Sequence, residues 1–242
     1  MSTETLNLDK KPLTSGGEDS ILAGVWRKVL TDLGVDDSAI LDRIDRYANK
    51  IMKTHPDKVT QVRGNLRIDV NKKGMTWFTF TKCLRVLGVN KLQIKFTLHH
   101  LRKVSVHTLD YELKDDFFDV KDKNKEETEP GALSTFFKQI QHDLGIGVRE
   151  FEQLLEYYIR RERLVVDLRN KTNIRGYLKK DFSAPRMSWR NFMKAMVFLC
   201  VLKMDLQVTL FFPRDITSVH SYKILLNDME DYSEELKNDL GI

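Results

Sequence analysis

The chain has 242 residues, of which 41% are hydrophobic and 31% charged, and its net charge is +5. No apolar run approaches the ~18 residues that cross a bilayer, and the first twenty residues lack the apolar core of a secretory signal. Two cysteines are too few for a disulfide framework. We therefore expect an intracellular, cytoplasmic α+β protein without membrane contact, long enough for one large core or two smaller ones.

Charge is distributed unevenly along the chain. Residues 1–20 hold 2 basic and 4 acidic residues, residues 115–130 hold 3 and 7, and residues 228–242 hold 1 and 6. The bodies between them are basic, with 18 basic and 9 acidic residues in 21–114, and 16 and 9 in 131–227. This predicts a flexible acidic N-terminal tail, an acidic linker and an acidic C-terminal segment. Two basic lobes favour a polyanionic partner, and an ordinary solvated surface is the alternative.

The two basic bodies resemble each other. Residues 63–100 align with residues 175–212 at a constant offset of 112, with 13 identities in 38 positions. The identities include three pairs with distinctive side chains, Arg63/Arg175, Asp69/Asp181 and Trp77/Trp189. Offsets of 111 upstream and 113 downstream extend the match. The sequence therefore predicts a tandem duplication, with one unit at 21–114 and the other at 131–227.

Each unit begins with two predicted helices. Residues 21–33 carry apolar side chains at helical spacing, and Gly34 follows where a C-cap glycine belongs. Asp36, Asp37 and Ser38 then offer an N-cap for a helix over residues 38–53. The second unit repeats this plan. About twenty further residues per unit, including a repeated Arg-Gly-x-Leu-x-x-Asp stretch, give no clear prediction.

A third helix and a hairpin complete the unit. Thr76 and Ser188 suit the N-caps of helices that begin with the paired tryptophans. Apolar residues then alternate with polar ones along 91–98 and 203–210, which is typical of strands with one buried face. Second strands follow near 104–108 and 216–222. The unit is thus α-α-α-β-β with an unassigned stretch before its third helix. Because a lone hairpin is marginal in water, we hypothesise that the two hairpins share one antiparallel sheet.

A helix followed by a basic hairpin resembles the winged-helix plan, in which the helix before the wing enters the major groove. On the face of this helix opposite the tryptophan, Lys82, Arg190 and Lys194 suit phosphates or base edges. Val86 and Phe198 lie on the same face and favour a helix that is buried on both sides. The candidate nucleic-acid contacts are basic residues on or near this helix and hairpin: Lys72, Lys73, Lys82, Lys91, Lys95, Lys179, Lys180, Arg186, Arg190 and Lys194.

The repeated Arg63/Asp69 and Arg175/Asp181 pairs are the most site-like polar features. An arginine fork can bind phosphate or carboxylate, and the glycine beside it permits close backbone approach. The favoured interpretation is structural, in which each arginine pairs with its own aspartate or a carbonyl and pins an irregular loop. The paired tryptophans are likewise assigned to the fold.

No enzymatic signature accompanies these features. His107 and His220 are equivalent, but neither has Cys, Asp or Glu at ligand spacing, so we expect no metal. Cys83 and Cys200 occupy non-equivalent positions and are predicted to be small buried hydrophobes. Phosphate-cradling loops and the common hydrolase and metallopeptidase motifs are absent from the sequence. We therefore expect a non-enzymatic protein without a cofactor.

Two functions remain open. The first is a two-lobed basic module that binds nucleic acid, mainly through phosphates. The second is a protein-interaction or assembly component of a larger complex, such as a viral or phage particle. In that case Phe78, Val86, Val197 and Phe198 would dock a partner or the other lobe. DNA, RNA and protein partners all stay open, as does the oligomeric state.

Overall fold

The computed structural model describes residues 21–53, 56–101, 103–113, 131–161, 171–185 and 187–226. The predicted acidic tail, linker and C-terminal segment lie outside the described residues, as does Arg186. We call the described residues up to 113 the first half and those from 131 onward the second half. No helix among them is long and apolar enough to cross a membrane.

The protein is α+β, as predicted, and its two halves have the same order of main elements. The first half contains α1 (Ile21–Asp32), α2 (Asp37–Ile51), α3 (Val59–Val70), α4 (Trp77–Val86), β1 (Lys91–His100) and β2 (Val104–Glu112). The second half contains α5 (Ala132–Leu144), α6 (Val148–Arg161), α7 (Lys171–Ser183), α8 (Trp189–Phe198), β3 (Val201–Phe211) and β4 (Thr217–Leu225). Short 3-10 turns lie at Pro56–Lys58 and Pro213–Asp215.

The stretch without a sequence prediction forms α3 and α7, so each half has four helices rather than three among its described residues. Gly64 and Gly176 lie inside these helices, and an added Cβ would meet nothing within 4 Å at either position. Close backbone approach therefore does not explain the repeated glycine. The expected N-caps do form, since Asp36, Thr76 and Ser188 each accept a hydrogen bond from the backbone N–H three residues later.

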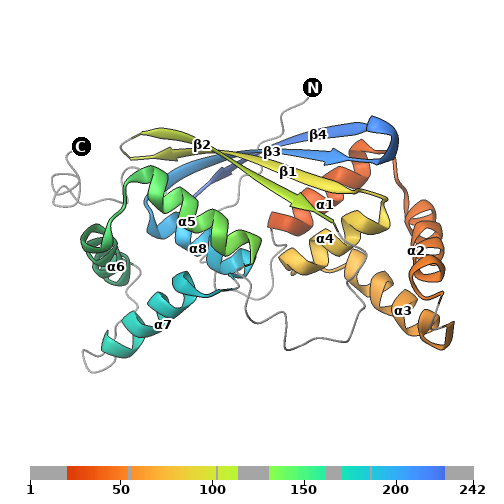
Figure 1. Ribbon diagram of the computed structural model, residues 1–242, viewed down its shortest axis with the longest axis horizontal. Helices are drawn as coiled ribbons and strands as arrows, with labels where there is room; N and C mark the ends of the chain where they lie inside the picture. Colours follow the sequence, from red (N-terminus) through yellow and green to blue (C-terminus); the bar gives the residue numbers. More distant parts are fainter. Residues whose placement is uncertain are drawn as a thin grey trace.

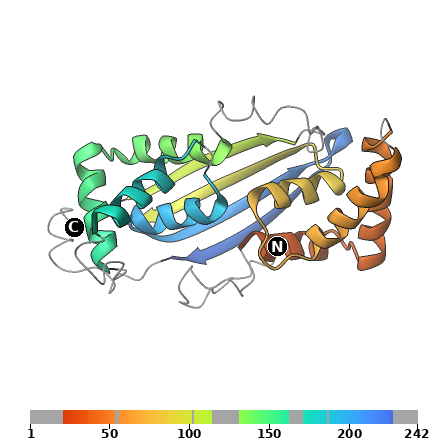
Figure 2. The ribbon, with the colours of Figure 1, turned by 90° about the horizontal axis from the view of Figure 1, so that it is seen from below.

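All four strands form one antiparallel sheet in the order β2-β1-β3-β4, which confirms that the two hairpins join. The central strands β1 and β3 pair with Leu92 opposite Leu210 and Leu98 opposite Met204. Figure 1 shows the sheet on one side of the molecule and the helices on the other. Figure 2 shows α5, α8, α4 and α1 lying across the inner face of the sheet. The pairs α2–α3 and α6–α7 lie at opposite ends (Figure 1).

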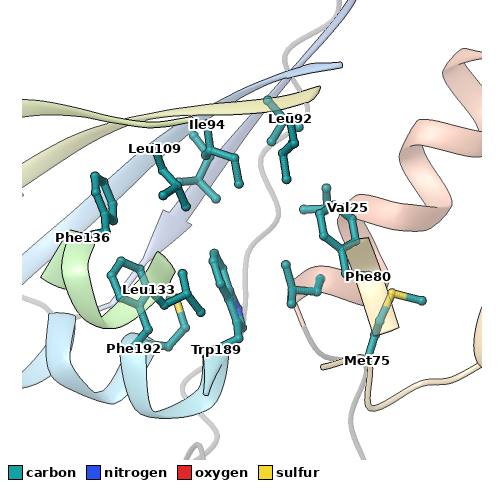
Figure 3. Close-up of a cluster of buried hydrophobic side chains, with 14 of the residues drawn as sticks. Val25, Met75, Phe80, Leu92, Ile94, Leu109, Leu133, Phe136, Trp189 and Phe192 are labelled. Atoms are coloured by element: carbon teal, nitrogen blue, oxygen red, sulfur yellow. The ribbon is translucent and has the colours of Figure 1, made fainter. Parts of the chain in front are cut away.

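One core runs beneath the sheet and is built from both halves. The alternating apolar residues of β1 and β3 are buried, and Figure 3 shows Ile94 and Leu109 pointing from the sheet towards the helices. Phe96 of β1 is 0% exposed, and its ring lies 4.8 Å from Phe136 of α5 and 5.8 Å from Phe192 of α8. A strand of the first half is therefore buried by helices of the second half.

The paired tryptophans meet where the two halves face each other. Trp77 begins α4 and Trp189 begins α8, and their rings stack with centroids 5.9 Å apart and planes 8° from parallel. Offset or parallel stacking of large aromatic rings stabilises a contact beyond the area that it buries. Both tryptophans therefore belong to the packing contact between the two halves.

The arrangement differs from the winged-helix plan. A wing would project as a hairpin beside an exposed recognition helix. Here both hairpins are joined through β1 and β3, and α4 is buried along most of its length, including Thr79, Lys82 and Val86. The helix α4 carries apolar residues on two opposite sides, and it buries most of this apolar surface when it lies between two packed layers.

Candidate phosphate-binding pocket

The structure distributes the predicted nucleic-acid contacts over several surfaces. They lie at and just after the end of α3 (Lys72, Lys73), on α4 (Lys82), on β1 (Lys91, Lys95), on α7 (Lys179, Lys180) and on α8 (Arg190, Lys194). Lys82 is only 8% exposed, and its ammonium group forms an ion pair with Asp69. A buried, paired ammonium cannot reach a phosphate, so the structure does not support Lys82 as a contact.

Carboxylates neutralise three more of these lysines. Lys72 Nζ lies 2.7 Å from Asp69, Lys91 Nζ lies 3.0 Å from Asp110, and Lys179 Nζ lies 2.5 Å from Glu152. The sheet face that carries Lys91 and Lys95 also carries Asp110, Glu112 and Asp205, because these residues pair across from outward-facing positions of β1. Its positive and negative charges nearly balance. The remaining exposed candidates are Lys73, Lys95, Lys180 and Arg190.

The repeated arginines do not pair with the repeated aspartates. Arg63 Nε lies 2.9 Å from Asp45 on α2, and Arg175 forms an ion pair with Glu152 on α6. The expectation assumed a loop, whereas residues six apart on a helix are 240° apart around its axis and cannot meet. Each arginine instead joins the third helix of its half to the second. Asp181 lies half-buried on α7.

Asp69 has a different role from the one expected. Its carboxylate is buried and pairs with Lys72 and Lys82. Although burial alone would raise the pKa of Asp69, the two ammonium groups hold it below its ordinary value of 3.8. The cluster therefore keeps a charged lysine within the helical layer by supplying it with a charged partner.

A basic pocket of about 400 Å³ lies at one end of the sheet, between α2, the turn after α4 and the turn between β3 and β4. Figure 1 shows α2 beyond this end of the sheet, close to the connection from β3 to β4. Its described lining residues are Arg43, Arg46, Tyr47, Lys50, Arg85, Val86, Leu87, Gly88, Asn90 and Pro213. They include four cations and no carboxylate, and we call this the basic pocket.

Three of the cations form a row on one wall. Arg43, Arg46 and Lys50 follow i, i+3, i+7 spacing on α2, which places them on one helix face over about 10 Å of axis. Arg43 Nη1 donates a hydrogen bond to the carbonyl of Leu87 at 2.9 Å. Because a guanidinium has five N–H donors, this bond positions the side chain and leaves other donors for a ligand.

The facing wall is the turn that leads from α4 into β1. Arg85 Nη1 donates to the carbonyl of Val89 at 3.2 Å and to Oδ1 of Asn90 at 2.6 Å. Gly88 adopts a φ of +90°, a conformation that glycine takes without strain. The reversal at Gly88 lets Arg85 at the end of α4 bond the two residues just before β1. Both walls are therefore held in place by hydrogen bonds within the chain.

The second half has no equivalent set of cations. The alignment pairs Lys50 with Arg161, so one cation is kept, but the positions paired with Arg43, Arg46 and Arg85 carry Leu154, Tyr157 and Val197. The pocket was not among the sequence predictions, which centred on the third helix and the hairpin. The signal was present in the spacing of the three cations along α2 and in the replacement of Arg43 and Arg46 by uncharged residues in the second unit.

Two chains of hydrogen bonds join the halves at the edges of the sheet. His107 of β2 lies 3.2 Å from Asp143 of α5 through Nδ1 and 2.9 Å from Ser105 through Nε2. His220 of β4 makes the corresponding contacts, 2.7 Å to Asp32 of α1 and 2.6 Å to Ser218. The two histidines thus do not meet each other. Each outer strand binds the first helix of the other half.

The Ser–His–Asp order of these chains is also the order in serine hydrolases. Both imidazoles are buried, and both chains lie at junctions between the halves, which favours a structural role. Burial holds the pKa of His107 below its ordinary value of 6.5, although Asp143 opposes this effect. A neutral imidazole fits the contacts, since Nδ1–H donates to the carboxylate and Nε2 accepts from the serine hydroxyl.

Among the described residues, no group of three or more His, Cys, Asp or Glu side chains could hold a metal ion. Cys83 and Cys200 are both buried, as predicted. The chain matches no protein-family model, no curated protein and no solved structure. The basic pocket is therefore interpreted from its own chemistry.

Proposed function

We propose that the protein is a tandem duplication whose halves form one non-enzymatic module that binds nucleic acid, mainly through phosphates. The strand register supports the duplication. The alignment pairs Leu92 with Met204 and Leu98 with Leu210. Exchanging the halves therefore converts the pair Leu92–Leu210 into Leu98–Met204, and both pairs occur between β1 and β3. This is the pattern expected of a pseudo-twofold axis through the sheet.

The basic pocket carries the functional proposal. Its described lining includes four cations and no carboxylate, whereas Lys72, Lys91 and Lys179 each form an ion pair with a carboxylate. Phosphate contacts by Lys and Arg supply most of the sequence-independent affinity for nucleic acid. Arginine binds phosphate oxygens through two parallel N–H donors, which adds geometric specificity. The pocket therefore suits phosphates better than the open sheet face does.

Fluorescence anisotropy of labelled single-stranded and duplex oligonucleotides over a salt series tests this function. The test variant is Arg46→Ala/Lys50→Ala, which removes two exposed cations from the pocket. The matched control is Lys138→Ala/Arg149→Ala, which removes two exposed cations from α5 and α6 of the second half. The wild-type affinity should fall steeply with salt, because each phosphate contact releases counterions.

The salt slope identifies the contacts. On a single strand, each lost phosphate contact lowers the magnitude of the slope of log affinity against log salt concentration by roughly 0.7. This slope should therefore be smaller by roughly 1.4 in the pocket variant and unchanged in the control variant. Absence of binding at low salt, or an affinity that does not change with salt, would reject the proposed function. Equal losses in the two variants would show that the pocket is not the contact site.

A second candidate, a protein-assembly component, is favoured by the outer strands. Val104, Val106 and Val219 are exposed along β2 and β4, and exposed apolar side chains suit a protein partner. Of the four residues expected from the sequence, Phe78 is 54% exposed, whereas Val86, Val197 and Phe198 are buried within the chain. Phe198 packs against Phe182 of α7 with ring centroids 4.8 Å apart. Native mass spectrometry that finds only monomer, alone and in lysate, would count against assembly.

A further inference from the structure

We infer that the basic pocket binds a phosphomonoester group at the end of a nucleic-acid strand, in preference to the phosphodiesters within it. The inference rests on the proposed function and names the ligand of the same site. It follows from the density of positive charge, from the position of that charge on two walls, and from the hydrogen bonds that hold two of the arginines in place.

Charge density is the first argument. Four cations line a space of about 400 Å³, and the described lining contains no carboxylate. An internal phosphodiester carries one negative charge and two non-bridging oxygens, whereas a terminal phosphate carries about −1.5 to −2 at pH 7 and three acceptor oxygens. A compact dianion with three acceptors therefore gains more from four convergent cations than a monoanion does.

The arrangement of the cations is the second argument. Arg43, Arg46 and Lys50 approach from α2, and Arg85 approaches from the last turn of α4. A strand end can present its phosphate to both walls at once. An internal phosphate has sugars on both sides, which must leave along the surface and which restrict access to its oxygens. The geometry of the two walls therefore favours an end.

The preorganisation of the walls is the third argument. Arg43 is fixed by its bond to Leu87 and Arg85 by its bonds to Val89 and Asn90. Long side chains that are already ordered lose less conformational entropy when a ligand binds. The fixed guanidinium groups also present a planar fork, which a lysine ammonium cannot reproduce.

The test compares oligonucleotides that differ only at the 5′ end. Labelled 5′-phosphorylated and 5′-hydroxyl strands of one sequence, with the label at the 3′ end, are titrated by anisotropy at a fixed salt concentration. Adenosine 5′-monophosphate and inorganic phosphate serve as unlabelled competitors. We expect the phosphorylated strand to bind about tenfold more tightly, as one additional set of charge-assisted hydrogen bonds would give.

Two variants separate the fork from the charge. Arg43→Lys keeps the charge but loses the guanidinium, so it should weaken the preference for the phosphorylated end severalfold while keeping the salt slope of the wild type. Because Arg43 also bonds Leu87, folding is checked by circular dichroism. If this variant does not fold, Arg46→Ala/Lys50→Ala removes one guanidinium together with two charges, so both its preference for the phosphorylated end and its salt slope should fall.

The outcomes distinguish the inference from the proposed function. Equal affinity for the two strands would overturn the inference and leave the proposed function intact. Binding of adenosine 5′-monophosphate detected by thermal shift, without binding of either oligonucleotide above background, would overturn both and assign the pocket to a free nucleotide. A preference that persists unchanged in the folded variants would show that the end binds elsewhere, which also overturns the inference.

Discussion

Replacement of Phe96 by alanine tests whether the two halves share one core. Phe96 lies on β1 of the first half, is 0% exposed, and contacts Phe136 and Phe192 of the second half. Truncation of a fully buried phenylalanine costs about 3–5 kcal/mol of unfolding free energy. For a protein of this size that corresponds to a decrease in Tm of roughly 6–20 °C. Lys95→Ala, one residue away on the opposite face, should stay within about 0.5 kcal/mol of the wild type.

The assay is guanidinium unfolding followed by tryptophan fluorescence and by far-UV circular dichroism. Of the three tryptophans, Trp77 and Trp189 lie in different halves and stack on each other, and Trp26 is buried in α1, so the fluorescence includes a contribution from the contact between the halves. We expect one transition, coincident by both probes, that moves to lower denaturant in Phe96→Ala and stays single. Two separate transitions, with only one of them shifted, would refute the shared core.

Three further predictions follow from the buried polar groups. Asp69→Asn should lower the free energy of unfolding, measured with denaturant, by about 3–5 kcal/mol, because it leaves the Lys82 ammonium buried without a charged partner. Adding Lys82→Met to this variant should recover part of the lost free energy. Burial lowers the pKa of His107, so the unfolded chain binds a proton more readily than the folded protein, and the free energy of unfolding should fall as the pH drops from 7.5 to 5.5. His107→Phe should flatten this pH dependence, whereas replacement of the exposed His142 by Gln should leave it unchanged. Burial raises the pKa of the Cys83 thiol to about 12, so a thiol reagent at pH 8 should label it only after unfolding.

Local patterns in the sequence predicted a large part of the fold. The helix caps at Asp36, Thr76 and Ser188 and the period-2 alternation of β1 and β3 depend on residues within a few positions of each other. The helix α3 was not predicted, because only four of its residues are buried and one of these is Asp69. Lys58, at its N-cap position, makes no capping hydrogen bond through its side chain. A helix with few apolar positions and no cap lacks both of the signals on which the prediction depends.

The candidate site was less predictable, because it joins residues that are distant in the sequence. The basic pocket brings α2 together with the turn after α4 and with Pro213 of the second half. The junction between Asp32 and His220 spans 188 positions. Each residue of that junction has a counterpart in the other unit, yet only the packing of α1 beneath β4 shows that they meet. Comparison of the two units could have identified the row of cations on α2, but not the turn that faces it.

Arginine modification mapped by mass spectrometry, with and without a bound oligonucleotide, tests the central claim most directly. The claim is that the basic pocket of the first half is the nucleic-acid contact. Arg43, Arg46 and Arg85 should become protected when the oligonucleotide binds, whereas Arg149 of the second half should react at an unchanged rate. Protection of Arg149 or Arg190 with no change at the three pocket arginines would contradict the account.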